Sequence, residues 1–186
     1  MQRVREQLAA VAARLIVEGQ LKQWQQARRK AAETLGLPLR GTPMPSDEEI
    51  VAALVTHQRL FGGDEHREQL RAQRETALEV MLALAHLSPR LTGAVAEGWA
   101  HAGSEIRIEV DCESEKMLDY ALIDLGVEYR VEPGPGESIH YVTDDADWPL
   151  RLVAGQRARM SAATPHATRL DVPALRKLLS EDSRLA

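Results

Sequence analysis

The chain has 186 residues, of which 44% are hydrophobic and only 4% aromatic, and its net charge is −5. This length suits one domain of ordinary size or a small domain with a helical extension, with a core of mainly Leu, Val, Ile and Ala. The longest apolar runs are far shorter than the roughly 20 residues of a membrane-spanning helix, so no membrane partner is expected. The N-terminus has no signal-peptide pattern, and the one cysteine, Cys112, excludes an intramolecular disulfide. We therefore expect a cytoplasmic protein.

The charges are unevenly distributed along the chain. Residues 1–40 hold eight Lys and Arg against three Asp and Glu, residues 105–147 hold three against thirteen, and residues 148–186 hold seven against three. Two interpretations fit this asymmetry. Either a basic end binds an anion, or oppositely charged segments of one chain pack on each other or on a second copy in a homodimer.

The N-terminal half is predicted to be helical. Hydrophobic residues at helical spacing predict a basic helical pair within residues 1–40, at 3–18 and 21–35. A connector with three prolines follows, and residues 46–87 are predicted to form two linking helices. The first of these begins at Ser46, which is followed three positions later by the glutamate of a capping box.

A cluster of cations on the second predicted helix suggests one kind of partner. Arg28, Arg29 and Lys30 are consecutive there, and in a helix-turn-helix protein the second helix enters the DNA major groove. A solvated helix face gives the same pattern, so nucleic-acid binding by these three residues is one alternative among several.

Residues 88–186 are predicted to form a sheet domain. A strand is expected over Leu91–Ala96, followed by a turn containing Gly98 and Gly103 and a second strand over 105–111, in which apolar and charged residues alternate. A crossover helix, three further strands and a C-terminal helix follow. The predicted fold class is therefore α+β, with a helical N-terminal half packed on a small mixed sheet.

Four stretches of the chain carry a resemblance to a known group of proteins. Residues 28–36, 58–64, 70–78 and 88–95 resemble proteobacterial proteins that are described as nucleotidyltransferase-like. In the wider nucleotidyltransferase superfamily, a strand leads to a Gly-Ser turn, a helix and an Asp-x-Asp strand, and a later strand adds a third carboxylate. The amides of the turn hold a triphosphate, and the carboxylates hold two divalent ions.

The resemblance implies a nucleotide site near the predicted glycine turn. It puts Gly98-Trp99 where Gly-Ser is expected, so an indole replaces a small hydroxyl, and it puts His101 and Ser104 beside this turn. Arg151 falls near the position of the third carboxylate. These five residues are the predicted nucleotide-binding residues.

The same resemblance puts Glu105, Arg107 and Glu109 at the catalytic positions of the second strand. Glu105 keeps a carboxylate, but Arg107 replaces the second metal ligand, and a guanidinium repels a metal ion. We expect Arg107 to occupy the place of the metal charge and to pair with Glu105 or Glu109. The histidines and Cys112 show no metal-ligand spacing, so no metal site is predicted from them.

Three hypotheses follow for the function. The first is a protein with a degenerate metal site, not active as an enzyme, that binds a nucleotide, a nucleic acid or a protein. The second is an active Mg²⁺-dependent nucleotidyltransferase that uses Glu105, Glu109 or Asp111 as unconventional ligands. The third is a DNA-binding or interaction protein that uses the basic helix. An ordinary solvated sheet face also explains the charged strand.

Overall fold

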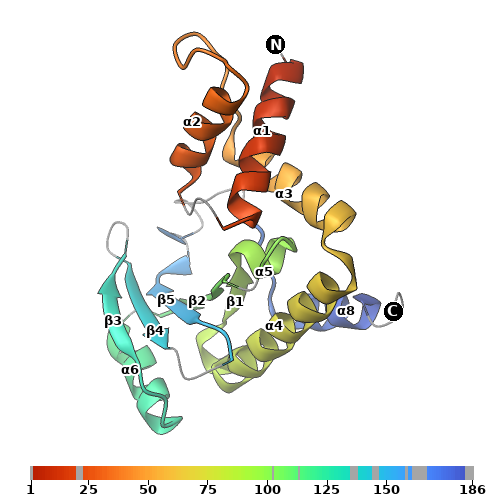
Figure 1. The fold of residues 1–186 in the computed structure, drawn as a ribbon. Coiled ribbons are helices and arrows are strands. Elements are labelled where there is room, and N and C mark those ends of the chain that lie inside the picture. Colours follow the sequence, from red (N-terminus) through yellow and green to blue (C-terminus); the bar gives the residue numbers. More distant parts are fainter. Residues whose placement is uncertain are drawn as a thin grey trace. The chain divides into compact units, whose positions relative to one another are not determined.

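The structure is a computed structural model, and it describes residues 2–19, 23–101, 103–112, 114–134, 138–143, 147–157, 159–160 and 167–182 (Figure 1). Helices together with a five-stranded mixed sheet confirm the α+β fold class. The chain divides into two compact units, Met1–Arg67 and Glu68–Ala186. This boundary falls inside the segment predicted to link the helical pair to the sheet. Within the described residues, no helix combines the length and apolarity that crossing a bilayer requires.

The first unit contains the helices α1 (Gln2–Val17), α2 (Trp24–Thr34) and α3 (Asp47–Phe61). The predicted helical pair is confirmed, although the first two residues of the second predicted helix lie outside the described part of the chain. Small side chains dominate the buried positions of α1 and α2, and this lets helix backbones approach closely. The fully buried residues of α1, α2 and α3 are Leu8, Ala12, Ala13, Ala27, Ala31, Ala32, Ile50 and Leu54.

The start of α3 is fixed by a capping box and an ion pair. The Ser46 hydroxyl accepts a hydrogen bond from the Glu49 amide, and the Glu49 carboxylate accepts one from the Ser46 amide. Arg28 of α2 donates to the Pro45 carbonyl at 2.8 Å and pairs with Asp47. The predicted capping box is therefore confirmed, and one of the three clustered cations connects α2 to α3.

The sheet of the second unit is built from five short strands in the order β1-β2-β5-β4-β3. Strands β2 and β5 are parallel, and the other neighbouring pairs are antiparallel. The strands are β1 (Arg90–Thr92), β2 (Ile106–Asp111), β3 (Arg130–Pro133), β4 (Ile139–Thr143) and β5 (Leu150–Gly155).

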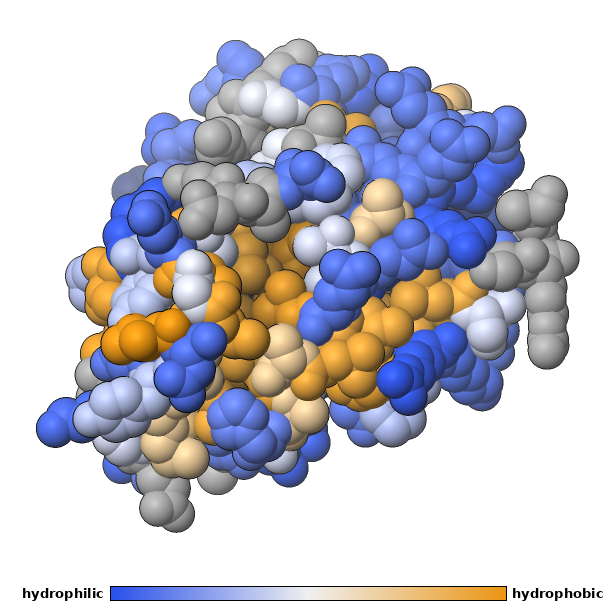
Figure 2. Space-filling view, turned by 90° about the horizontal axis from the view of Figure 1, so that it is seen from below, coloured by the Kyte–Doolittle hydropathy of each residue, from blue (hydrophilic) through white to orange (hydrophobic). Residues whose placement is uncertain are grey.

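The two faces of this sheet differ in chemistry. The even-numbered residues of β2 and β5 are apolar and buried, and they pack with residues of the helices α4 (Gly63–Ala83), α6 (Glu115–Asp124) and α8 (Val172–Asp182). The other face carries charged side chains, as the predicted alternation in the second strand required. Seen from below, hydrophobic residues form a band along the molecule (Figure 2).

The predicted strand Leu91–Ala96 is wrong beyond Thr92. Gly93 adopts a positive φ of 71°, which turns the chain out of β1, and the helix α5 (Gly93–Glu97) begins there. A short apolar run does not by itself distinguish a buried strand from a helix. The chain therefore passes from strand to helix at Gly93, five residues before the glycine that the sequence singled out.

Candidate functional site

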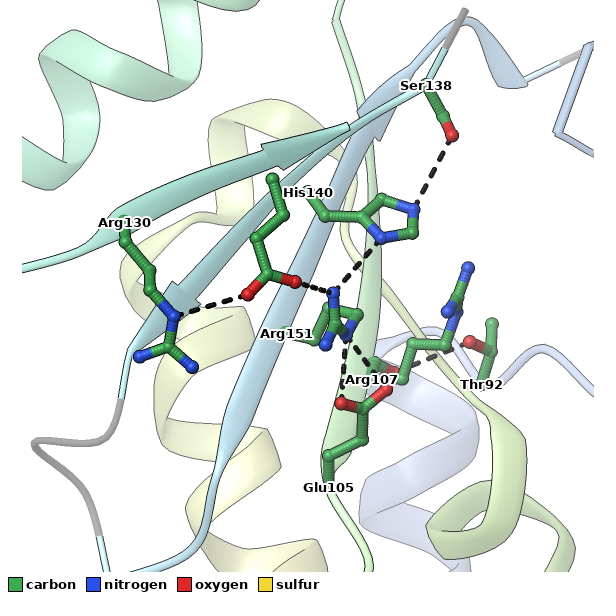
Figure 3. Close-up of polar contacts among 8 residues, drawn as sticks. Thr92, Glu105, Arg107, Arg130, Ser138, His140 and Arg151 are labelled. Atoms are coloured by element: carbon green, nitrogen blue, oxygen red, sulfur yellow. Dashed lines mark hydrogen bonds and ion pairs between the residues drawn. The ribbon is translucent and has the colours of Figure 1, made fainter. Parts of the chain in front are cut away.

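The charged face of the sheet brings together side chains from four strands (Figure 3). Arg107 of β2 lies beside Arg151 of β5 in the parallel register. On the hairpin, Glu132 of β3 lies opposite His140 of β4. Glu105 immediately precedes β2 and contacts Arg151. The predicted residues Glu105, Arg107 and Arg151 are therefore neighbours, and Glu132 and His140 join them.

Arg151 is held by two carboxylates and a histidine. Its Nε donates to both carboxylate oxygens of Glu105, at 3.0 and 2.8 Å. Its Nη1 donates to Glu132 Oε2 at 2.9 Å and faces His140 Nδ1 at 3.2 Å. Hydrogen bonds from Arg151 and then from Arg130 lower the pKa of the Glu132 carboxyl. Two carboxylates thus balance the charge of Arg151 and stabilise it in place.

Arg107 differs, because within the described residues no side chain lies at hydrogen-bond or ion-pair distance from its guanidinium. Its backbone carbonyl accepts a hydrogen bond from Thr92 Oγ1 at 3.5 Å. Burial lowers the pKa of Arg107, and the nearby charges of Glu105 and Glu109 act in the opposite direction. A guanidinium has five N–H donors, and withdrawing it from water without a partner is unfavourable. Among the residues that the structure describes, Arg107 therefore has a guanidinium that no side chain pairs with.

The expected pairing of Arg107 with Glu105 or Glu109 is wrong. Glu105 pairs with Arg151, and Glu109 pairs with Arg169 at 2.8 Å, where both side chains are only 10% exposed. The sequence did not indicate these partners because Arg151 and Arg169 are 46 and 60 residues away along the chain. Their proximity depends on the parallel register and on the return of the chain after β5.

All the carboxylates of this β2 segment have an arginine partner. Besides the pairs of Glu105 and Glu109, Asp111 accepts a hydrogen bond from the Arg157 amide at 3.0 Å and pairs with its guanidinium at 3.3 Å. Among the described residues there is no group of three Asp, Glu, His or Cys that could hold a metal ion. Glu105, Glu109 and Asp111 are therefore each held by an arginine and do not form a site for Mg²⁺.

His140 lies buried at the edge of this cluster. Burial, followed by the charges of Arg107 and Arg151, lowers its pKa. Because arginine can only donate hydrogen bonds, His140 Nδ1 accepts from Arg151 and the ring proton belongs on Nε2, which faces Ser138 Oγ at 3.5 Å. His140 is thus a neutral group that helps to orient Arg151.

The predicted turn residues lie in the segment after α5. Gly98 ends this helix with a φ of 87°, and a Cβ there would lie 3.4 Å from Arg74 of α4. The Trp99 indole donates to Glu97 at 2.8 Å, and the His101 amide donates to Ser104 Oγ at 3.0 Å. These hydrogen bonds stabilise the conformation of the connection between α5 and β2.

Gly93 is the glycine beside the candidate site. A Cβ at this position would lie 3.9 Å from both Cβ and Cδ of Arg107. Its positive φ turns the chain from β1 into α5, so no side chain stands between this turn and Arg107. The sequence Thr92-Gly93-Ala94 contains the glycine of this turn. We did not predict a turn there because we expected a strand through Ala96.

The cations of α2 are mostly engaged within the first unit. Arg28 pairs with Asp47, and Lys30 pairs with Glu33 at 3.3 Å, while Arg29 is exposed.

A buried arginine that the sequence did not indicate lies in the second unit. Arg74 donates to the Val95 carbonyl at 3.2 Å and pairs with Asp182 at 2.9 Å.

Comparison of the chain with protein-family models, with curated proteins and with solved structures gave no match. The evidence about function is therefore the geometry of the charged face, where no described side chain pairs with the Arg107 guanidinium.

Proposed function

We propose that this protein binds a nucleotide through its phosphate groups at Arg107, as a nucleotidyltransferase-like module that works without the two-metal reaction. The observation that carries the proposal is the Arg107 guanidinium, partly buried and without a side-chain partner among the described residues. A phosphate supplies the paired oxygens that a guanidinium fork prefers. Neutralising Arg107 in this way would offset the unfavourable burial of its charge.

The order of elements supports the nucleotidyltransferase-like part of the proposal. Strand β1, the turn at Gly93, helix α5 and strand β2 follow one another as the resemblance implies, with Ala94 rather than serine after the glycine. Strand β5 pairs with β2 in parallel, so that Arg107 and Arg151 are adjacent. These are the two positions where the resemblance implies carboxylates.

The ion pairs support a binding role without catalysis. Two-metal catalysis requires carboxylates that are free to hold divalent cations, but Glu105 and Glu109 are paired with Arg151 and Arg169. In the proposed complex, Arg107 supplies the positive charge that Mg²⁺ supplies in the active superfamily members. The exposed α2 cation Arg29 gives little support to DNA binding, because its neighbours Arg28 and Lys30 already pair with carboxylates.

Calorimetric titration of adenosine, AMP and ATP tests this proposal, with each ligand measured in excess Mg²⁺ and in excess EDTA. We expect no binding of adenosine and increasing affinity from AMP to ATP, because the phosphates provide the contact. We also expect the ATP affinity to be at least as high in EDTA, because Mg²⁺ competes for the phosphate oxygens. Binding of ATP only when Mg²⁺ is present would contradict the proposal and favour an active transferase.

A further inference from the structure

An apolar groove lies between α4 and α6, away from the charged face of the sheet. It is lined by Val80 and Ala83 of α4 and by Leu84 just after that helix, by Leu122 of α6 and by Leu125 just after it, and by Leu152 of β5. Its volume is about 250 Å³. Its volume is below the roughly 300–1,000 Å³ of small-molecule pockets, so it suits inserted side chains better than a ligand.

A separate apolar surface lies on the outer side of α6. Met117, Tyr120 and Ile123 are 45%, 65% and 63% exposed, and their spacing of three residues places them along one side of the helix. The opposite side of α6 is buried against the core through Leu118 and Leu122. A surface helix normally has one apolar side and one polar side. Exposed apolar residues gathered on one side of a surface helix are typical of a protein-binding surface.

The charges around this surface are predominantly acidic. Glu79 of α4 lines the groove, whereas Glu75, one turn earlier, pairs with Arg71. On and after α6, the exposed rim carries Asp124 and Glu128, and Lys116 is the one cation of that helix. A partner that is complementary to this rim must carry positive charge next to its apolar residues.

We propose that the groove between α4 and α6 binds an amphipathic helix of another protein, with an apolar stripe flanked by Lys and Arg. The apolar stripe of such a helix inserts side chains beside Ala83 and Leu125, and its cations lie near Glu79 and Glu128. A symmetric dimer through the same surface would place acidic rim against acidic rim, which disfavours a second copy of this chain. An anionic membrane surface is repelled for the same reason.

The direct test is binding of a fluorescent peptide of about 20 residues, above the roughly 12–15 residues below which isolated helices are marginal, with leucines at i, i+3, i+4 and i+7 and lysines beside them. The control peptide has glutamate in place of every lysine. The full chain is titrated into each peptide and the anisotropy is measured. We expect the lysine peptide to bind and the glutamate peptide to bind at least about tenfold more weakly, with a difference that shrinks as salt screens the charges.

Two exposed alanines provide matched variants of the protein. Ala83→Arg places a bulky cation in the groove, whereas Ala85→Arg places the same side chain two residues away, outside the groove lining. Both positions are exposed, so neither variant disturbs the core. We expect Ala83→Arg to lower the affinity for the lysine peptide by about tenfold or more and Ala85→Arg to change it little.

Three results would overturn the proposal. They are no binding of the lysine peptide, equal binding of the two peptides, and equal affinity of the Ala83→Arg and wild-type proteins. Sedimentation velocity adds a fourth. If the wild-type protein self-associates and Ala83→Arg alone abolishes this, the groove is an interface between copies of the chain, and the proposal of a cationic partner helix is wrong.

Discussion

The Arg107 guanidinium has no side-chain partner among the described residues, because the carboxylates near it pair with other arginines. Along β2, the carboxylates at 105, 109 and 111 all have arginine partners, and these partners come from later in the chain. The alternating pattern of the sequence correctly predicted which face Arg107 occupies. It could not predict its lack of a partner, because the pairing depends on the strand order β2-β5-β4-β3, and local pattern does not determine strand order.

His140 is expected to make stability depend on pH. Burial lowers its pKa in the folded protein relative to about 6.5 in the unfolded chain. The unfolded state therefore binds more protons below that pH, so the contribution of His140 to stability is present above pH 6.5 and is lost as the pH falls towards the folded pKa. In His140→Gln, the free energy of unfolding by urea should fall less between pH 7.5 and about 5.5.

The matched control is His86→Gln, at an exposed position of the short turn before β1. Its pH profile should follow that of the wild-type protein. Parallel profiles for His140→Gln and the wild-type protein would contradict the assignment of His140 as a buried, neutral group.

Arg74 gives a second prediction for a single residue. Its pKa is lowered by burial, and Asp182 is the carboxylate that balances its charge. Asp182→Asn leaves a buried guanidinium with weaker neutralisation, and because Asp182 itself is partly exposed we expect a loss of about 2 kcal/mol in the free energy of unfolding.

The comparison for Asp182→Asn is Glu75→Gln, which breaks the exposed Arg71–Glu75 pair on the same helix α4. This change should cost less than about 0.5 kcal/mol. Urea unfolding at neutral pH measures both variants. Equal losses would show that burial adds nothing to the Arg74–Asp182 pair.

At the scale of elements, the sequence predicted the helices better than the strands. Helical spacing of apolar residues predicted α1, α3 and α8, and the capping box predicted the start of α3; in the structure Asp171 also caps α8 by accepting from the Ala174 amide at 2.9 Å. The segment from Gly93 to Glu97 was predicted as strand because its apolar run is too short to show a period. Because of that one error, we expected the turn at Gly98, whereas the turn from strand to helix lies at Gly93.

The capping box of α3 predicts a measurable loss of helix stability. Ser46→Ala removes the hydroxyl that accepts from the Glu49 amide, and it should lower the free energy of unfolding by about 1 kcal/mol. Thr56→Ala is the control within the same helix, because the Thr56 hydroxyl bonds to the Ala52 carbonyl, which already belongs to the helix. This change should be close to neutral, since alanine is the better helix former. Circular dichroism during urea unfolding distinguishes the two, and equal losses would contradict a capping role for Ser46.

At the scale of the whole molecule, the charge asymmetry of the sequence has an intramolecular explanation. The acidic segment 105–147 supplies Glu105, Glu109 and Asp111, and the basic segment 148–186 supplies their arginine partners. The prediction that oppositely charged segments pack on each other is therefore confirmed for these two segments. The sequence alone could not distinguish this outcome from an anion-binding basic end.

The two units should differ in stability. The buried positions of α1 and α2 are mainly alanine, whereas the core of the second unit contains many Leu, Ile and Val side chains. Burial of apolar area provides most of the stability, and a unit of about 60 residues is marginal by this measure. Native-state hydrogen exchange should therefore show faster exchange in α1 and α2 than in β2 and β5. Equal protection in both units would contradict this expectation.

The central claim is that Arg107 is the anion-binding group of this protein, and ATP titration without Mg²⁺ tests it most directly. The three proteins to compare are the wild type, Arg107→Met and Arg29→Met, of which the last removes an exposed cation of α2. A charged hydrogen bond contributes about 1.5–3 kcal/mol, so Arg107→Met should weaken ATP binding by about tenfold or more, and Arg29→Met should leave it unchanged. Unchanged affinity of the Arg107→Met protein, with its fold intact by circular dichroism, would contradict the claim.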